Sequence, residues 1–295
     1  MTPLRKRMLE DMQLRNLSPE TQRAYVHYIY GLARYYHSSP EHLSLEEIRE
    51  YQLYLINVRR YSPESVNAFV SAAKFLYNAT LETPWPEGAL PRARVPQKLP
   101  VVLSPAETEE FFQHVCTIRY RAALMTAYGA GLRVSEVVRL RVGDIDSSRM
   151  LIRIRQGKGK KDRYAMLSPR LLTVLRCWWH SRMTPAGHKP SPEDWLFPGF
   201  SRGSHMNTES LQTACGEAAR LTGIGKRVTV HTLRHSFATH MLEGGTDIRI
   251  IQALLGHASI QTTTRYVAVS PNTIARASSP LDRIGGPRKT TKTRR

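Results

Sequence analysis

Apolar positions recur at helical spacing through residues 1–83 of the chain. One run begins after Ser18 and another after Ser62, and each serine is followed by a Pro and a Glu. This order is typical of a helix N-cap, a first helical residue and an acid in the first turn. Ser44 and Glu47 have the spacing of a capping box. The pattern predicts a bundle of four short helices, with the aromatic stripe in its core rather than on a base-stacking surface.

The helical period stops between residues 84 and 103. This stretch contains five prolines and no amphipathic pattern, which is typical of a linker between domains. Ser104, Pro105 and Glu107 then combine a helix cap, a first-turn proline and a capping-box acid. A second domain is therefore predicted to begin here, and we place it over residues 104–284.

Most of the second domain is predicted to be helical, with one β-hairpin. Residues 150–155 (MLIRIR) alternate apolar and basic side chains, and residues 163–167 (RYAML) follow a basic, glycine-containing tip. Helical patterns cover residues 171–179, 207–222 and 232–243, and the last ends at two glycines. The predicted fold is mainly α, with an N-terminal helical bundle and a mostly α domain that contains a small antiparallel β-sheet.

The net charge of +19 indicates that the protein binds a polyanion. Residues 1–83 carry 10 Lys or Arg against 9 Asp or Glu, so nearly the whole excess lies beyond residue 83. Nucleic acid is the expected partner, and an acidic membrane surface is the alternative. The sequence contains no evident basic amphipathic helix with an exposed aromatic face, which argues against binding to a membrane surface. Residues 285–295 include five basic side chains and no acid, and are predicted to form a disordered basic tail.

Several functional classes find no support in the sequence. A hydrophobic content of 41% and a charged content of 23% are typical of a soluble globular protein. No apolar run has the length of a membrane span and no signal peptide is evident, so a cytoplasmic location is expected. His231 and His235 are four residues apart but have no third ligand at useful spacing, so no metal or other cofactor is expected. The cysteines allow neither a disulfide framework nor a CxxC site, and are expected to be buried: Cys116, Cys177 and Cys215.

Unusual residues concentrate in four segments of the second domain. The first segment (GAGLRVSE) places Arg133 just past a double-glycine turn, where a helix is predicted to begin. The second places Lys158 at the tip of the hairpin. The third starts a helix at His231, so His231 and Arg234 lie one turn apart on the same face. The fourth contains the two remaining candidates, nine residues apart: His257 and Tyr266.

Metal-free attack on a phosphodiester needs these types of residue. The non-bridging oxygens need fixed cations, and the guanidinium groups of two arginines offer planar forks that stay charged. A Lys suits the donation of a proton to the departing sugar oxygen, and His suits proton transfer near neutral pH. A Tyr suits the nucleophile, but its ordinary pKa of about 10 means that nearby positive charge or a base must activate it.

The order Arg, Lys, His-x-x-Arg, His, Tyr resembles that of the tyrosine recombinases, a family of phage-type integrases that includes the Xer-type enzymes. Four strings carry the resemblance, in the family's order: GLRVSEVVRL, QGKGKKDR, HTLRHSFATHML and LLGHASIQTTTRY. Residues 1–83 resemble the SAM-like core-binding domain of the family, and residues 104–284 resemble its catalytic domain. The resemblance implies a site-specific recombinase or integrase that cuts and rejoins double-stranded DNA.

The resemblance also implies a role for each candidate. Tyr266 would attack the scissile phosphate and form a 3′-phosphotyrosyl link, while Arg133 and Arg234 hold the phosphate oxygens. Lys158 would protonate the leaving 5′-oxygen. His231 would act as a general base or as a hydrogen-bond partner of the tyrosine.

Further implications concern the remaining residues and the assembly. His257 would donate a hydrogen bond to the phosphate in the transition state. ATP would not be needed, because the phosphotyrosine conserves the bond energy, and the family resemblance implies that no metal is needed either. A homotetramer on paired DNA sites is implied, and the overall resemblance favours an enzyme of a mobile element. Apart from the resemblance, Glu136 taken alone is interpreted as a structural residue that ties Arg133 or a neighbouring helix by an ion pair, and His235 and His240 are interpreted as packing or DNA-facing residues.

Two alternatives remain open at the level of the sequence. A type IB topoisomerase would relax supercoils as a monomer with a similar site, although the separate helical N-terminal domain and the HTLRH string favour a recombinase. A DNA-binding regulator that has lost catalysis is the other alternative, against which the intact set of six residues argues. Each residue taken singly could be ordinary, since Tyr266 is one of 13 tyrosines, so the interpretation rests on the ordered set.

Overall fold

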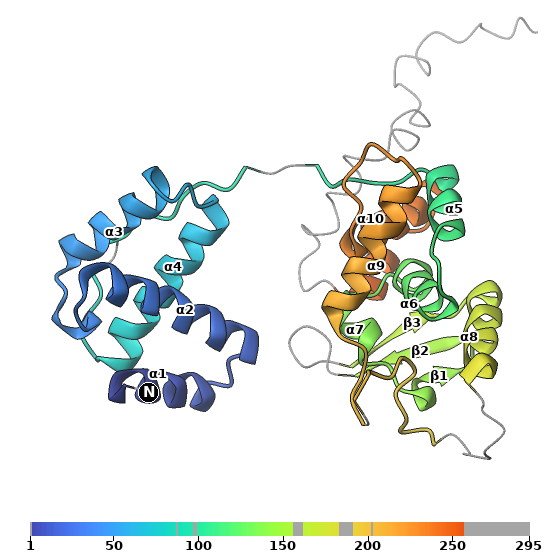
Figure 1. Cartoon of the computed structure of the whole chain (residues 1–295), viewed down its shortest axis with the longest axis horizontal. Coiled ribbons are helices and arrows are strands. Elements are labelled where there is room, and N and C mark those ends of the chain that lie inside the picture. Colours follow the sequence, from blue (N-terminus) through green and yellow to red (C-terminus); the bar gives the residue numbers. More distant parts are fainter. Residues whose placement is uncertain are drawn as a thin grey trace, which may run out of the picture. The chain divides into compact units, whose positions relative to one another are not determined.

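The computed structural model of the chain describes residues 2–86, 88–96, 99–155, 162–182, 191–201 and 203–256 (Figure 1). The chain forms two compact units, Met1–Gln97 and Lys98–Arg295, and each has its own hydrophobic core. The predicted tail at residues 285–295 lies outside the described residues. So do three of the six candidate site residues: Lys158, His257 and Tyr266.

The N-terminal unit is the bundle of four helices that the hydrophobic pattern predicts. The serines Ser18 and Ser62 each accept a hydrogen bond from a backbone N–H in the first turn of the helix that follows, as N-caps do. Ser44 and Glu47 form both hydrogen bonds of a capping box. The helices are α1 (Pro3–Leu14), α2 (Pro19–Tyr36), α3 (Leu45–Asn57) and α4 (Pro63–Phe75), with a 3₁₀ turn at Pro40–His42 and a π-helical end at Leu76–Thr80.

The predicted aromatic stripe of α2 faces the core of this unit. Ile29 and Leu32 are buried, and the tyrosines of the same stripe are half-buried against the core: Tyr25, Tyr28 and Tyr36. These rings therefore contribute mainly to packing, as the helical spacing indicates.

The two ends of the proline-rich stretch each pack on the unit to which they belong. The side-chain amide of Asn67 donates to the carbonyl of Ala93 at 2.9 Å and accepts from its N–H at 2.8 Å. At the other end of the stretch, Leu103 is buried, and its N–H donates to the hydroxyl of Ser236 at 2.9 Å. Each end of the stretch is thus attached to the unit that it adjoins.

The second unit is the predicted mostly helical domain with a small sheet. The predicted hairpin is confirmed as β2 and β3, in which Ile152 lies opposite Ala165. A third antiparallel strand, β1, was not predicted, because a strand of two residues carries no periodic signal. The strands are β1 (Ile145–Asp146), β2 (Leu151–Ile154) and β3 (Arg163–Met166), in the order β1–β2–β3. The helices are α5 (Pro105–Gln113), α6 (Ile118–Gly129), α7 (Val134–Val138), a 3₁₀ turn (Val142–Asp144), α8 (Pro169–Arg182), α9 (Thr208–Leu221), α10 (Val230–Glu243) and α11 (Ile248–Leu255).

Helix α6 is central in this unit and packs against α8, α9 and α10 (Figure 1). Helix α11 packs against α10 and against strand β3. Buried apolar side chains from several elements form the core between them, among them Leu124, Leu132, Ile152 and Leu233. This packing brings α7, β3, α10 and the end of α11 together, although they are far apart in the sequence.

The sequence leaves open whether His240 of α10 packs in the interior or faces DNA, and the structure shows it as a packing residue. Its Nε2 lies 2.8 Å from the carbonyl of Leu103, and its Nδ1 lies 2.9 Å from the hydroxyl of Tyr128. A carbonyl can only accept, so Nε2 donates this bond, and in the neutral ring Nδ1 accepts from the tyrosine hydroxyl. The ring thereby ties the start of the second unit to α6 and α10.

The expectation that the cysteines are buried is wrong for two of the three. Cys116 lies in the turn between α5 and α6 and is exposed. Cys177 is exposed because α8 turns Leu171 and Leu175 to the core and Cys177 to the opposite side. Cys215 is buried, and burial raises the pKa of its thiol to about 12. In the described part of the chain, no helix has both the length and the apolar character needed to span a membrane.

Candidate functional site

A tight turn places Arg133 at the start of α7. Gly131 has a φ of 63°, and a Cβ there would lie 2.6 Å from the ring of Phe237, so glycine is required. Arg133 is the N-cap of α7, and its backbone N–H donates to Glu136 Oε2 at 2.8 Å. Its guanidinium Nη1 donates to Glu136 Oε1 at 2.9 Å. The ion pair expected between Glu136 and Arg133 is therefore present, and it holds the arginine at the helix start.

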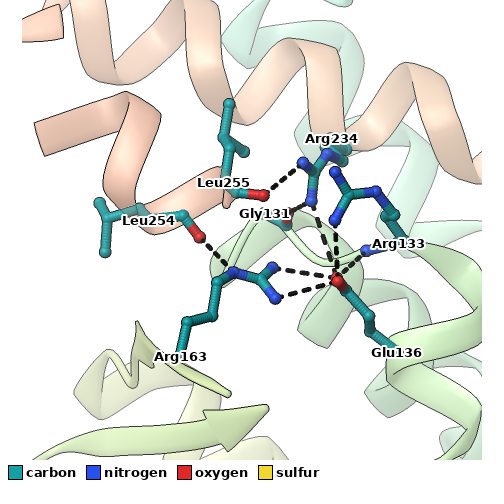
Figure 2. Close-up of polar contacts among 7 residues, drawn as sticks. All are labelled: Gly131, Arg133, Glu136, Arg163, Arg234, Leu254 and Leu255. Carbon is teal, nitrogen blue, oxygen red and sulfur yellow. Dashed lines mark hydrogen bonds and ion pairs between the residues drawn. The ribbon is translucent and has the colours of Figure 1, made fainter. Parts of the chain in front are cut away.

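The Glu136 carboxylate also holds a second arginine in a bidentate pair. Nη1 and Nη2 of Arg163 donate to its two oxygens at 2.9 and 3.0 Å (Figure 2). With the two bonds from Arg133, the carboxylate accepts four hydrogen bonds, which fills its acceptor capacity. Burial opposes the ionisation of Glu136, but hydrogen bonds and charge from Arg163, and then from Arg133, lower its pKa below the ordinary value. Glu136 is therefore a buried anion at neutral pH.

Arg234 is the most buried of the described charged groups at this site, with 1% of the residue exposed. From α10, its Nη1 donates to the carbonyl of Gly131 at 2.6 Å, and its Nη2 donates to the carbonyl of Leu255 at 2.7 Å. Nη1 also lies 3.7 Å from Glu136 Oε2. One guanidinium thereby joins the glycine turn, α10 and the end of α11 (Figure 2). These acceptors compensate the desolvation of the buried cation.

Arg163, on β3, is a member of this cluster that sequence reasoning missed. Besides its pair with Glu136, its Nε donates to the carbonyl of Leu254 at 3.0 Å. The last carbonyls of α11, those of Leu254 and Leu255, thus each accept a hydrogen bond from an arginine, where the helix dipole favours cations. The basic residues of the string QGKGKKDR, which ends at Arg163, distinguish this segment in the sequence. Nothing local distinguished Arg163 from the neighbouring lysines, because its partner Glu136 is 27 positions away.

His231 lies one turn before Arg234 in α10, at the edge of the cluster, and is exposed. Partial desolvation by the protein around its ring, and then the charges of Arg234 and Arg133, lower the pKa of His231 below its ordinary value. The imidazole is therefore mostly neutral at neutral pH and can accept a proton. Its ring packs edge-on against that of His235, with centroids 4.8 Å apart.

Three guanidinium groups surround one carboxylate in this cluster, which leaves two net positive charges. The side chain of Arg133 is 21% exposed, whereas that of Arg234 is 2% exposed. Fixed positive charge at the boundary between protein and solvent attracts an anion, and partial burial strengthens the interaction. The arrangement is therefore suited to bind a phosphate group next to Arg133 and His231.

The structure brings together three of the six predicted residues: Arg133, His231 and Arg234. The other three, Lys158, His257 and Tyr266, lie outside the described residues. In the sequence, Lys158 falls between the two strands of the hairpin, and His257 directly follows the end of α11. Among the residues that the structure describes, no three His, Cys, Asp or Glu side chains form a group that could hold a metal ion.

Comparison with known proteins gives matches over both units. The pattern of the phage integrase family matches residues 101–273, and that of the phage integrase N-terminal SAM-like domain matches residues 4–87. A Sinorhizobium fredii protein, y4qK, provisionally named an integrase/recombinase, is 45% identical over 291 residues, which cover 98% of this chain and 92% of the relative. The tyrosine recombinase XerA of Pyrococcus furiosus is 32% identical over 295 residues, which cover 96% of this chain and 98% of the relative.

The fold has a counterpart among solved structures. XerH site-specific recombinase, in a post-cleavage complex with a palindromic difH substrate, aligns with a TM-score of 0.69 at 21% identity. The alignment covers 92% of this chain and 83% of the XerH chain. At this level of identity the likeness concerns the fold.

Proposed function

This chain belongs to the phage integrase family of tyrosine recombinases, and we propose that its arginine cluster binds the scissile phosphate of double-stranded DNA while Tyr266 attacks it. Family membership gives the class of reaction, which is site-specific DNA recombination. The observation that carries the assignment of residues is the cluster of three arginines around the Glu136 carboxylate. It supplies fixed positive charge at the position where two residues of the ordered set meet, Arg133 and Arg234.

The first step forms one bond and breaks one. The phenolic oxygen of Tyr266 bonds to phosphorus, and the bond from phosphorus to the 5′-oxygen breaks. His231, which is mostly neutral at neutral pH, takes up the proton of the tyrosine, and Lys158 gives a proton to the leaving 5′-oxygen. The products are a 3′-phosphotyrosyl link and a free 5′-hydroxyl. The reverse attack by a 5′-hydroxyl of another strand rejoins the DNA without ATP or metal.

The positive groups stabilise the charge on the phosphate during this step. Arg133 and Arg234 clamp the non-bridging oxygens, and His257 donates a further hydrogen bond in the transition state. Of the two arginines, Arg133 has the more accessible guanidinium. Arg234 is held by backbone carbonyls, so it enters the reaction already oriented.

The wider assignment follows the same family pattern. Residues 1–83 form the core-binding domain that grips DNA, residues 84–103 connect the domains, and residues 104–284 form the catalytic domain. The basic excess beyond residue 83 supplies salt-sensitive phosphate contacts. A homotetramer assembles on paired DNA sites, and the enzyme serves a mobile element.

Covalent capture on DNA tests this proposal without knowledge of the target site. The full chain is incubated with nicked duplexes of random sequence, in which cleavage releases a short fragment and so blocks the reverse step. Denatured protein is then recovered and its attached DNA is sequenced. We expect adducts that share a common sequence and that disappear with Tyr266→Phe. Adducts that persist in this variant, or no adducts at all, would contradict the proposal.

A plasmid assay then separates a recombinase from a topoisomerase. Two copies of the selected site in one plasmid should recombine with each other. Relaxation of supercoils without any exchange between the sites would favour the topoisomerase alternative.

A further inference from the structure

Arg163 connects three elements that carry or adjoin the reacting groups. It is the first residue of β3, it pairs with Glu136 of α7, and its Nε donates to the Leu254 carbonyl near the end of α11. In the sequence, Lys158 lies shortly before this strand and His257 shortly after this helix. The side chain of Arg163 is 12% exposed, so it is a component of the interior rather than a surface cation.

The end of α11 is shaped to fit Arg163. Gly256 caps this helix with a left-handed φ of 63°. A Cβ on Gly256 would lie 2.8 Å from Cδ and 2.9 Å from Nε of Arg163. The backbone therefore passes directly over the arginine, and only glycine allows this approach without displacing it.

Arg163 also determines how Glu136 can hold Arg133. Oε1 of Glu136 accepts from Nη1 of both arginines, at 2.9 Å each. The bidentate pair with Arg163 fixes the plane of the carboxylate, because two parallel bonds do not allow rotation. Without Arg163, hydrogen bonds from the backbone N–H and the Nη1 of Arg133 would remain on the two carboxylate oxygens, so the orientation of Glu136 and of the Arg133 guanidinium would be less tightly fixed.

We propose that Arg163 is a positioning residue for DNA cleavage, which locks β3, Glu136 and the end of α11 into one arrangement. The inference rests on the proposed function, but it adds a residue outside the ordered set of six. Arg163 acts through Glu136 and through the α11 backbone and does not touch the DNA. Its planar fork makes bonds in two directions at once, to the carboxylate and to the Leu254 carbonyl. A lysine, with a single ammonium group, keeps the charge but not this geometry.

The test compares Arg163→Lys and Arg163→Gln with the unchanged chain on the captured DNA site. DNA binding is measured as Kd, and cleavage is measured as the single-turnover rate of adduct formation. We expect both variants to cleave about 100-fold more slowly, as displacement of an oriented group by about 1 Å can cost this much, with Kd changed less than about threefold. Arg153→Gln on β2 is the control, because its ion pair with Asp162 is half exposed and it should keep nearly the full rate.

The outcomes separate this inference from the proposed function. If the unchanged chain forms no adduct, the proposed function itself fails. If it forms adducts and Arg163→Lys cleaves at the full rate, charge alone suffices and the positioning role is wrong. Should Arg163→Gln fail to fold, Arg163→Lys still decides, since it keeps a cation beside Glu136. Loss of folding in both variants, seen as loss of cooperative unfolding, would overturn the inference in favour of a purely structural role.

Discussion

Nη1 of Arg234 donates a hydrogen bond to the carbonyl of Gly131 at 2.6 Å, across 103 positions of the sequence. The bond joins α10 to the turn that presents Arg133. The turn, the arginine and the start of α7 therefore support one another, and a change in the turn should affect both stability and cleavage.

Gly131→Ala should destabilise the protein by about 2 kcal/mol or more, because an L residue is strained at this φ and its Cβ would meet Phe237 at 2.6 Å. It should also slow cleavage, since the carbonyl that holds Arg234 would shift. Gly216→Ala is the matched control, because Gly216 lies in α9 with nothing near its Cβ position. The control should be stabilising by about 0.5–1 kcal/mol. Urea unfolding measures the free energy of unfolding of both variants. Equal changes in Gly131→Ala and Gly216→Ala would contradict the structural role of Gly131.

Arg133→Lys and Arg234→Lys should reduce stability to different extents, but both should greatly slow DNA cleavage. Arg234 is buried and makes two hydrogen bonds to carbonyls, so its loss should cost about 2–4 kcal/mol. Arg133 is partly exposed, and its loss should cost no more than about 1 kcal/mol. Single-turnover cleavage should fall by about 100-fold or more in each, because a phosphate oxygen loses its oriented donor. Full cleavage by either variant would remove that arginine from the proposed mechanism.

The neutral form of His231 should persist to lower pH than that of an ordinary histidine. Desolvation and the charges of Arg234 and Arg133 lower its pKa, so its titration midpoint should lie below about 6.5. The unfolded chain then binds the proton at higher pH than the folded chain does. The stability contribution of neutral His231 is therefore complete above about pH 6.5 and is lost as pH falls toward the folded pKa. NMR titration of the ring, assigned with His231→Gln, measures the midpoint, and a value at or above 6.5 would contradict the assignment.

Glu136→Gln should destabilise the protein by about 3–5 kcal/mol, because it leaves the guanidiniums of Arg133 and Arg163 without their shared anion. The folded pKa of Glu136 is lowered, so this difference from the unchanged chain should be complete above about pH 4.5. It should shrink as pH falls through the folded pKa. Glu46→Gln, which breaks the exposed pair of Glu46 with Arg49, should have little effect. If the difference in free energy of unfolding between Glu136→Gln and the unchanged chain stays constant at acidic pH, the charge of Glu136 is not the cause of the destabilisation.

Local signals in the sequence predict local structure well. The capping boxes at Ser44 and Ser104 are present, with both reciprocal hydrogen bonds. The interpretation of Glu136 as the ion-pair partner of Arg133 or of a neighbouring helix is confirmed for Arg133, which lies three residues away. Residues that interact within one helical turn leave a pattern that can be read directly.

Long-range contacts leave no such pattern. Arg163 reaches Glu136 over 27 positions and Leu254 over 91 positions, so its role depends on the packing of α11 against β3. The burial of Arg234 is similar, since spacing places it beside His231 but does not show that carbonyls of Gly131 and Leu255 enclose it. Propensity and periodicity describe elements, whereas these contacts arise only when the elements are assembled.

The most direct test of the central claim is to identify the residue that carries the DNA. Trypsin digestion of the captured adduct should release residues 266–276 (YVAVSPNTIAR), a peptide whose only tyrosine is Tyr266. Nuclease trimming and mass spectrometry should then show one nucleotide on this tyrosine, linked through its 3′-phosphate. Attachment to any other residue, or through a 5′-phosphate, would contradict the assignment of Tyr266 as the nucleophile.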